Sequence, residues 1–459
     1  SLLPLIFDAY ESGRVRDVQI RQGLMDIAKG EHKYRHTAQG IVKTSYALDD
    51  LVRYHFGDEL PKTGATPEEP GYWRLRYGDL DGVPIADWPA AAQKYACDDA
   101  LWSYRLWDKL FKEEAFDVPN EVEQNCAAWA LRLAGIWGLR TDAEATKIFR
   151  ANVEREYEEI YARLRKIGLV RADGSRDMKI IAAVVEDAYK RAGRIVPRTP
   201  QGNPKTSEEV LSESGDENLE LLGRTSELRT TLSRYVPMLE LGTQLPMNPG
   251  WIPLLETGRV ACREPNVMNP PRNSVKIEKD GVTETLGDVR SCFVPREGCV
   301  FVAADYDGAE LRSWCQVCID LDGSSTMCEA IKNGDDLHLR LAAVILGISY
   351  EEVKQRHADG DEVVVTTRQF AKKPNFSLPG GAGPTRLQGM FKEEGIAISL
   401  DQAKQYKQAW LDTWAEARPY LERMSNETRM GETTITQLRS GLIRGRVGYS
   451  DGLTSYFQG

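Results

Sequence analysis

The stretch FVAADYDGAELRSW, residues 301–314, places two carboxylates where an apolar run gives way to a helical pattern. The apolar run 301–304 predicts a buried strand that ends at Asp305, and Glu310 follows five residues later, where a helix begins. An aspartate between a strand and a helix is commonly an N-cap, which accepts backbone N–H groups of the first helical turn. The alternative is a metal ligand, because hard cations take carboxylate oxygens and a strand end is a rigid support.

A second stretch, TTRQFAKKPNFSLPGG at residues 366–381, carries positive charge on one face of a predicted helix. Arg368, Lys372 and Phe376 recur every four residues, and no carboxylate stands among them. Such a stripe is often a solvated face with one anchoring ring, and it is also a surface that can bind phosphates and a base or sugar. The following Pro and Gly residues predict the end of the helix. His338 lies in an earlier helical segment, and its role depends on its neighbours.

The composition argues against a general attraction to nucleic acid and against a membrane span. The 459 residues carry a formal net charge of −10, so a nucleic-acid surface must be a local basic patch. No run of about 18 apolar residues occurs, and we expect no membrane partner. Eight cysteines show no disulfide framework, and Cys315 and Cys318 form a lone CxxC, so we expect reduced thiols and a cytoplasmic protein. Because the chain opens at Ser1 in mid-pattern, we expect a truncated N-terminus.

Helical and loop patterns between the two ends place further candidates. Residues 121–165 predict a long amphipathic helical stretch. A basic loop over residues 190–205 contains Arg198, a candidate phosphate contact that is otherwise read as part of a solvated surface. The loop leads into a predicted capping box formed by Thr206 and Glu209.

Six motifs, in order along the chain, resemble those of family A DNA polymerases. DYDGAELR, which begins at Asp305, resembles the first palm motif. RQFAKKPNFSLPGG resembles the fingers-helix motif, with a Pro-Gly-Gly ending most similar to phage members of the family. The other four are similar to elements of the proofreading exonuclease, the thumb, the thumb–palm junction and the fingers: YACDDALWSYRLW, RTPQGNPKTSEEVL, TGRVACREPNVMNPP and LHLRLAAVILG. The matches cover nearly the whole chain.

The resemblance implies an α+β multidomain fold: a right-hand polymerase with thumb, palm and fingers, preceded by the remnant of an RNase H-like 3′–5′ exonuclease domain. The expected parts are a partial exonuclease domain, the thumb with connecting helices, the palm with the first catalytic motif, the fingers, and the start of the returning palm, at residues 1–115, 116–245, 246–320, 321–435 and 436–459.

The resemblance also implies residue roles in template-directed, primer-dependent DNA synthesis. Asp305 and the backbone carbonyl of Tyr306 would bind Mg²⁺ in a two-metal site, and Lys372 would be catalytic at the phosphates. The nucleotide contacts implied are Arg368 and His338 at the outer phosphates, Glu310 as a steric gate against ribose, and Phe376 against the sugar.

DNA contacts and an exonuclease remnant are implied in the same way. The DNA contacts would be Arg259, Asn269 and Gln458, with Arg198 of the basic loop. Tyr95 and Asp99 match the third exonuclease motif, in which Asp99 would be a metal ligand. The partners that the resemblance implies are primer–template DNA and deoxynucleoside triphosphates. It also implies that the protein is a monomer.

The sequence departs from the family pattern in several places. Asp307-Gly308-Ala309 replaces Ser-Gln-Ile, and Gly380 stands where a tyrosine is usual. The second palm motif, His-Asp-Glu, and the first two exonuclease motifs are missing from the chain, so we expect a fragment with two incomplete sites. Two other interpretations stay open. One is a single-subunit RNA polymerase, which Glu310 and the TGR element disfavour; the other is a non-catalytic nucleic-acid-binding scaffold on a polymerase fold.

Overall fold

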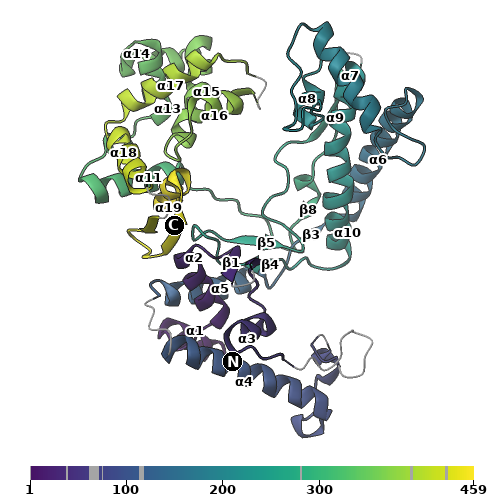
Figure 1. Cartoon of the computed structure of the whole chain (residues 1–459), viewed down its shortest axis with the longest axis vertical. Helices are drawn as coiled ribbons and strands as arrows, with labels where there is room; N and C mark the ends of the chain where they lie inside the picture. The colour runs from purple at the N-terminus through teal and green to yellow at the C-terminus, as the bar shows by residue number, and fades with distance from the viewer. Residues whose placement is uncertain are drawn as a thin grey trace. The chain divides into compact units, whose positions relative to one another are not determined.

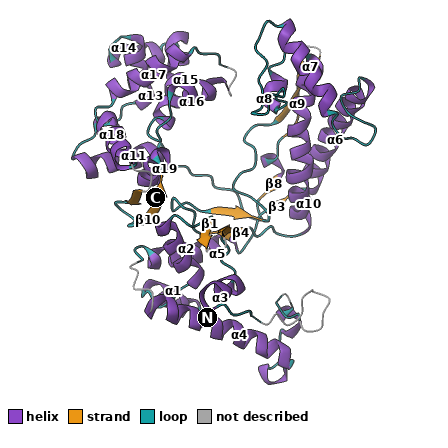
Figure 2. Cartoon of the chain, in the orientation of Figure 1, coloured by secondary structure: helices purple, strands orange, loops and turns teal. Residues whose placement is uncertain are grey.

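The computed structural model describes residues 2–37, 40–60, 72–74, 76–112, 118–279, 282–392, 396–429 and 433–458. The chain divides into two compact units, and we treat each by itself. The first unit consists of Ser1–Ala130, Pro253–Val260 and Asp305–Gly459, and the second unit of Leu131–Ile252 and Ala261–Ala304. Helices predominate, and every sheet in the described residues has two strands (Figure 2).

The second unit has a helical core flanked by short antiparallel strand pairs. Its elements are β3 (Arg140–Thr141), α6 (Ala143–Lys166), α7 (Met178–Arg191), α8 (Glu208–Ser212), α9 (Glu217–Thr230), η3 (Thr231–Tyr235), α10 (Val236–Gln244), β4 (Gly250–Ile252), β5 (Ala261–Arg263), β6 (Val275–Lys279), β7 (Val282–Gly287), η4 (Arg290–Cys292) and β8 (Phe293–Val294). Helix α6 packs against α9 and α10 (Figure 1), and buried Val153, Leu222 and Leu239 join these helices in one core.

The helical stretch predicted at 121–165 is confirmed for most of its length, but as two helices: α5 (Glu121–Gly135) ends, and β3 pairs with β8 before α6 begins. Gly138 turns the chain between the two helices with φ +63°, where an added Cβ would lie 2.8 Å from the Pro246 side chain. The predicted capping box is wrong, because Ser207 is the N-cap of α8, which puts Glu209 at the second helical position instead of the third.

The amino-terminal part of the first unit is mainly helical. Its elements are α1 (Leu3–Glu11), α2 (Val18–Lys29), β1 (Tyr34–Thr37), β2 (Gly40–Lys43), α3 (Leu48–Phe56), η1 (Tyr77–Leu80), η2 (Ile85–Asp87) and α4 (Ala90–Lys112), followed by α5. Buried Leu24 and Ile27 of α2 pack with Leu254 and Leu442, which come from much later in the sequence. The segment 253–260 is therefore anchored in the first unit.

The carboxy-terminal part of the first unit positions the candidate site. Its elements are α11 (Ala309–Asp322), α12 (Thr326–Lys332), α13 (Leu337–Leu346), α14 (Tyr350–Ala358), α15 (Glu362–Ser377), α16 (Pro384–Lys392), α17 (Leu400–Thr413), α18 (Ala417–Glu427), β9 (Thr433–Thr436), β10 (Ile443–Val447) and α19 (Tyr449–Gln458). Trp314, Trp410, Trp414 and Tyr420 are buried in a core shared by α11, α15, α17, α18 and α19. Helices α13, α15, α16 and α17 lie together in Figure 1.

The predicted strand 301–304 is wrong. These residues have no strand conformation, and the Val302 side chain is 88% exposed. An apolar run becomes a strand only where another strand pairs with it, and none of the described residues does so here. Asp305 consequently lies in an exposed loop, and Gly308, with φ +60°, is the N-cap of α11, so Asp305 is not an N-cap either.

Within the described residues, no helix combines the length and the apolar character that crossing a bilayer would require.

Candidate functional site

Helices α13 and α15 meet around one carboxylate, that of Asp336. Its Oδ1 caps α13, accepting from the backbone N–H groups of His338 at 2.8 Å and Leu339 at 3.0 Å. Its Oδ2 accepts from Nε and Nη2 of Arg368 on α15, at 2.8 and 2.6 Å. The expectation that this arginine lacks a counter-charge holds within α15 but is wrong for the folded chain. The pairing fixes the guanidinium beside the first turn of α13.

His338 is held in a defined tautomer beside the two cations of α15. Trp414 can only donate, and its Nε1 gives a 3.1 Å hydrogen bond to Asn375 Oδ1. The Asn375 Nδ2 group therefore faces His338 Nδ1, at 3.0 Å, and must donate to it. In the neutral ring the proton then lies on Nε2, which is a hydrogen-bond donor. Phe376 lies 5.5 Å from the His338 ring, centroid to centroid.

Burial, with the positive charges of Arg368 and Lys372, lowers the pKa of His338 from its usual 6.5 to about 4, although the Asp336 carboxylate opposes the shift. The site therefore presents a neutral imidazole donor and two cations at neutral pH. A cation pair flanking an N–H donor suits a polyphosphate better than it suits a metal ion.

Acidification is expected to loosen the α13–α15 contact through His338. Because the folded-state pKa lies below the unfolded one, the folded state binds fewer protons, and its stability is lost as pH falls from about 6.5 toward 4. At pH 5 the loss is at most about 2 kcal/mol. Hydrogen–deuterium exchange of α13 at pH 7 and pH 5, corrected for intrinsic exchange, measures it.

The matched variants for that measurement are His338→Gln and His55→Gln. Burial also lowers the pKa of His55 to about 4, but this histidine lies on α3. His338→Gln should make α13 protection nearly independent of pH, and His55→Gln should leave its acid response intact. An equal acid response in all three proteins would contradict the assignment to His338.

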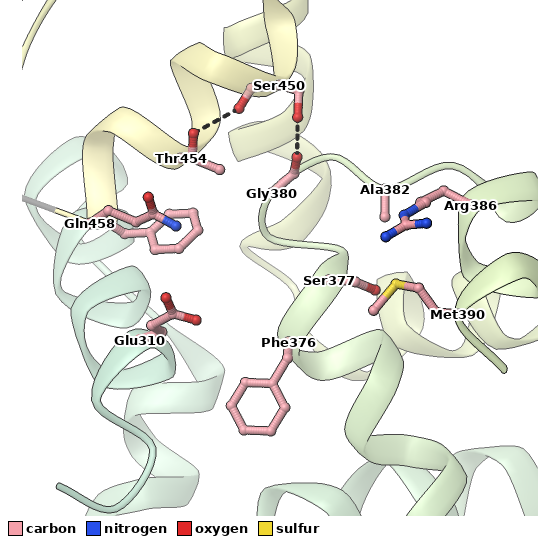
Figure 3. A pocket seen from close by; sticks show the side chains of 11 residues that line it. Glu310, Phe376, Ser377, Gly380, Ala382, Arg386, Met390, Ser450, Thr454 and Gln458 are labelled. Carbon is pink, nitrogen blue, oxygen red and sulfur yellow. Dashed lines mark hydrogen bonds between the residues drawn. The ribbon is translucent and has the colours of Figure 1, made fainter. Parts of the chain in front are cut away.

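A cavity of about 290 Å³ opens between α11, α15, α16 and α19. Figure 3 shows Glu310 and Phe376 on one side of it and Gln458, Ser450 and Thr454 of α19 on another. The loop after α15 closes it with small residues, among them Gly380, whose carbonyl accepts from Ser450 Oγ at 2.9 Å. The cavity thus brings together residues predicted to meet a sugar and a primer end.

Glu310 is paired with Arg259 at the edge of this cavity. Arg259 Nη2 donates to Glu310 Oε1, and both side chains are about half exposed. Arg259 comes from a tight turn: the N–H of Gly258 donates to the Leu255 carbonyl at 2.9 Å, and the N–H of Leu255 donates to the Arg259 carbonyl at 2.9 Å. Predicted as a DNA contact, Arg259 in this structure orients the predicted sugar gate.

Asp305 and Tyr306 lie in the exposed loop that precedes α11, and the charge of Asp307 in the same loop acts on His338. Arg312 Nε donates to the carbonyl of Asp307 at 2.8 Å, and this bond holds the loop to the helix. Among the described residues, no three His, Cys, Asp or Glu side chains gather to hold a metal ion. The loop offers oxygen ligands suited to Mg²⁺ but not a two-metal cage.

The remaining predicted residues are distributed over both units. Asn269 and Arg198 belong to the second unit, where Arg198 Nη2 donates to Glu186 at 3.0 Å and is already paired. Tyr95 and Asp99 lie one turn apart on α4, and burial raises the pKa of the Asp99 carboxyl. Cys315 and Cys318 are buried thiols, as the sequence predicted.

Four functional candidates were not found from the sequence. Asp336 could have been found from the sequence, because an Asp that directly precedes a helical pattern is a typical N-cap. Asn375 stands in the fingers-helix motif, but nothing in the motif marks it as the partner of His338. Gln437 and Arg444 carry no sequence signal that separates them from surface residues. Burial distinguishes these three residues, which are at most 9% exposed.

Comparison with known proteins agrees with this arrangement. The model of DNA polymerase family A matches residues 177–444, more than half of the 459 residues. DNA polymerase I of Aquifex aeolicus is 26% identical over 382 residues, which are 77% of this chain and 61% of that protein. DNA polymerase I of Pseudomonas aeruginosa is 26% identical over 427 residues, 85% of this chain and 40% of that protein. The chain thus spans less than two thirds of either relative.

The fold is similar to a solved structure described as the POL domain of Pol1 from M. smegmatis in complex with DNA primer-template and dNTP. The similarity has a TM-score of 0.59 at 18% identity and covers 96% of this chain and 67% of that one. The predicted polymerase fold is confirmed. The exonuclease remnant, the domain boundaries, the likeness to phage members and the truncation stay predictions. With the family model matching most of α7 through β10, the chain belongs to the family A DNA polymerases.

Proposed function

We propose that the protein catalyses template-directed, primer-dependent DNA synthesis, transferring deoxynucleotidyl groups to a primer with release of pyrophosphate. The observation that carries this proposal is the arrangement in the first unit. Arg368, Lys372 and His338, which we call the phosphate-binding face after the role proposed for them, lie next to a cavity edged by Glu310 and Phe376. Family membership and the relatives named DNA polymerase I support the same conclusion.

The phosphate-binding face would receive the triphosphate. Arg368, held by Asp336, offers its remaining N–H groups in a fixed orientation, and Lys372 stands one turn further along α15. His338 Nε2 adds a hydrogen-bond donor without adding a third positive charge to those of Arg368 and Lys372. Lys372 is the group we assign to proton delivery at the leaving pyrophosphate.

The cavity would receive the sugar and the primer end. Phe376, 45% exposed, presents its ring to the nucleotide sugar, and Glu310 stands where a ribose 2′-hydroxyl would need room. Gln458 lines the same cavity and would contact the terminal base pair on its minor-groove side.

Mg²⁺ is the cofactor that the family implies, and the described residues do not by themselves fit a two-metal site. Asp305 supplies a single carboxylate and Tyr306 a carbonyl, both exposed. We therefore assign Asp305 and the Tyr306 carbonyl as the ligands that this chain would offer to Mg²⁺.

The partners proposed are primer–template DNA and deoxynucleoside triphosphates, bound by a monomeric, cytoplasmic enzyme. The solved structure of similar fold is described with both ligands. Arg259 and Asn269 are the proposed DNA contacts, and Arg198 would have to leave Glu186 to join them. Tyr95 and Asp99 are proposed as the exonuclease remnant.

The proposal is tested by primer extension with the full-length protein on templates that differ in the first unpaired base. The expected product carries the complementary deoxynucleotide each time and forms only on primed template. Synthesis from ribonucleotides without a primer would indicate an RNA polymerase instead. Duplex binding with no incorporation under any condition would indicate a scaffold.

A further inference from the structure

Gln437, directly after β9, is a buried side chain that uses its whole amide group. It is 2% exposed, and its Nε2 donates to the carbonyls of Thr257 at 3.0 Å and Ser455 at 2.8 Å. Its Oε1 accepts from Ser440 Oγ, which fixes the orientation of the amide. One side chain thus joins the 253–260 segment to α19.

Arg444 on β10 makes a second link between the same two segments. Its Nη1 donates to Ser455 Oγ at 2.8 Å, and its Nη2 donates to Glu256 Oε2 at 3.1 Å. The side chain is mostly buried, so these bonds are not exchanged freely for water. Gln437 and Arg444 therefore hold Glu256 and Thr257 at a set distance from Ser455.

One linked segment pairs with Glu310, and the other lines the same cavity as Glu310. Two residues after Thr257, Arg259 leaves its tight turn and pairs with the Glu310 carboxylate. One helical turn after Ser455, Gln458 lines the cavity with Glu310. A shift between Thr257 and Ser455 would move Arg259 and Gln458 apart and release Glu310 from its partner.

We propose that Gln437 is a positioning residue for sugar selection, which acts through Arg259 on the placement of Glu310. This inference rests on the proposed function and adds to it the hairpin β9–β10 as the part that sets the geometry of the gate. Gln437 itself lies behind the segments that line the cavity and touches no substrate.

The test is the Gln437→Met variant, which keeps the side-chain length and removes both donors. The ratio of kcat/KM for a deoxynucleotide to that for the matching ribonucleotide should fall about tenfold, because displacements near 1 Å at a reacting centre have effects of this order or larger. Ser440→Ala frees the amide to turn and also removes the acceptor of the Leu442 N–H, and it should shift the ratio in the same direction by about threefold.

A double-mutant cycle separates positioning from a general loss of packing. If Gln437 acts through Glu310, Gln437→Met should change the sugar ratio much less when Glu310 is already alanine. The matched control is Glu416→Gln, a buried carboxylate that accepts from Ser325 Oγ at 2.6 Å and Met327 N–H at 3.0 Å at the start of α12. It should lower stability without changing the ratio.

The outcomes are distinct. An unchanged sugar ratio in Gln437→Met and Ser440→Ala, with extension intact, would overturn the inference and leave the proposed function standing. A ratio that falls equally in the Glu310→Ala background would also overturn it. If the wild-type protein incorporates nothing on any primed template, the proposed function itself fails.

Discussion

Arg368→Ala is expected to lower kcat/KM for deoxynucleotide incorporation by about 100- to 10,000-fold. Two charge-assisted hydrogen bonds to a triphosphate contribute about 1.5–3 kcal/mol each, and each 1.36 kcal/mol is a factor of ten. The loss is enlarged because the variant leaves the Asp336 carboxylate, now bound at 2.6 Å by Arg368, without its cation beside the substrate phosphates. Single-nucleotide incorporation kinetics on a primed template measure it.

Arg340→Ala is the matched control for Arg368→Ala. Arg340 Nε donates to the Asp335 carboxylate at 2.8 Å, in the residue next to Asp336, and its guanidinium lies 4.7 Å from the centre of the Tyr350 ring. This variant breaks a similar pair away from the phosphate-binding face, so kcat/KM should change by less than about threefold. Equal losses in both variants would mean that Arg368 supports the fold of α13 and not the nucleotide.

Glu310→Ala is expected to admit ribonucleotides, lowering discrimination against them by about 100-fold. Removing the carboxylate opens the edge of the cavity and also frees Arg259, so two determinants of the sugar position are lost together. A pocket that must reject a substrate carrying one additional hydroxyl reaches about 100-fold, so loss of the gate should remove discrimination of this order. The measurement is the ratio of kcat/KM for paired deoxy- and ribonucleotides opposite the same template base.

Asp322→Ala provides the control on the same helix. Asp322 also pairs with an arginine, accepting from Arg423 Nη2 at 2.7 Å, but it is the last residue of α11. The sugar ratio should stay at the wild-type value in this variant. Discrimination that is unchanged in Glu310→Ala would show that Glu310 is not the gate.

The placement of Arg368, Lys372 and Phe376 on one helix was predictable because its signal is local. Residues four apart on a helix share a face whatever the rest of the chain does, so Arg368, Lys372 and Phe376 could be grouped from spacing alone. The end of α15 at Ser377 likewise follows from the Pro and Gly that come after it. The polymerase fold followed from the order of six motifs.

The failures concern partners that are distant in sequence. Whether an apolar run such as 301–304 becomes a strand depends on a pairing strand that the run itself does not specify. The pairing of Arg368 with Asp336 and the hydrogen bonds of Gln437 arise only when separate helices pack together. The link from Gln437 to Thr257 spans 180 residues of sequence.

The division of the chain has a consequence for its biosynthesis. The first unit takes its residues from three stretches, and the second unit lies between them in sequence. On the ribosome, residues 131–304 are complete before any of 305–459 exist. At about 5–20 residues per second, about 10 to 30 seconds then pass before the last of these is added. During most of that time the second unit can fold, while the turn that carries Arg259 still lacks its contact from Gln437. The contacts that hold the proposed gate are therefore among the last parts of the chain to form, and nascent chains stalled just before Gln437 should contain a protease-resistant second unit and an unprotected segment 253–260.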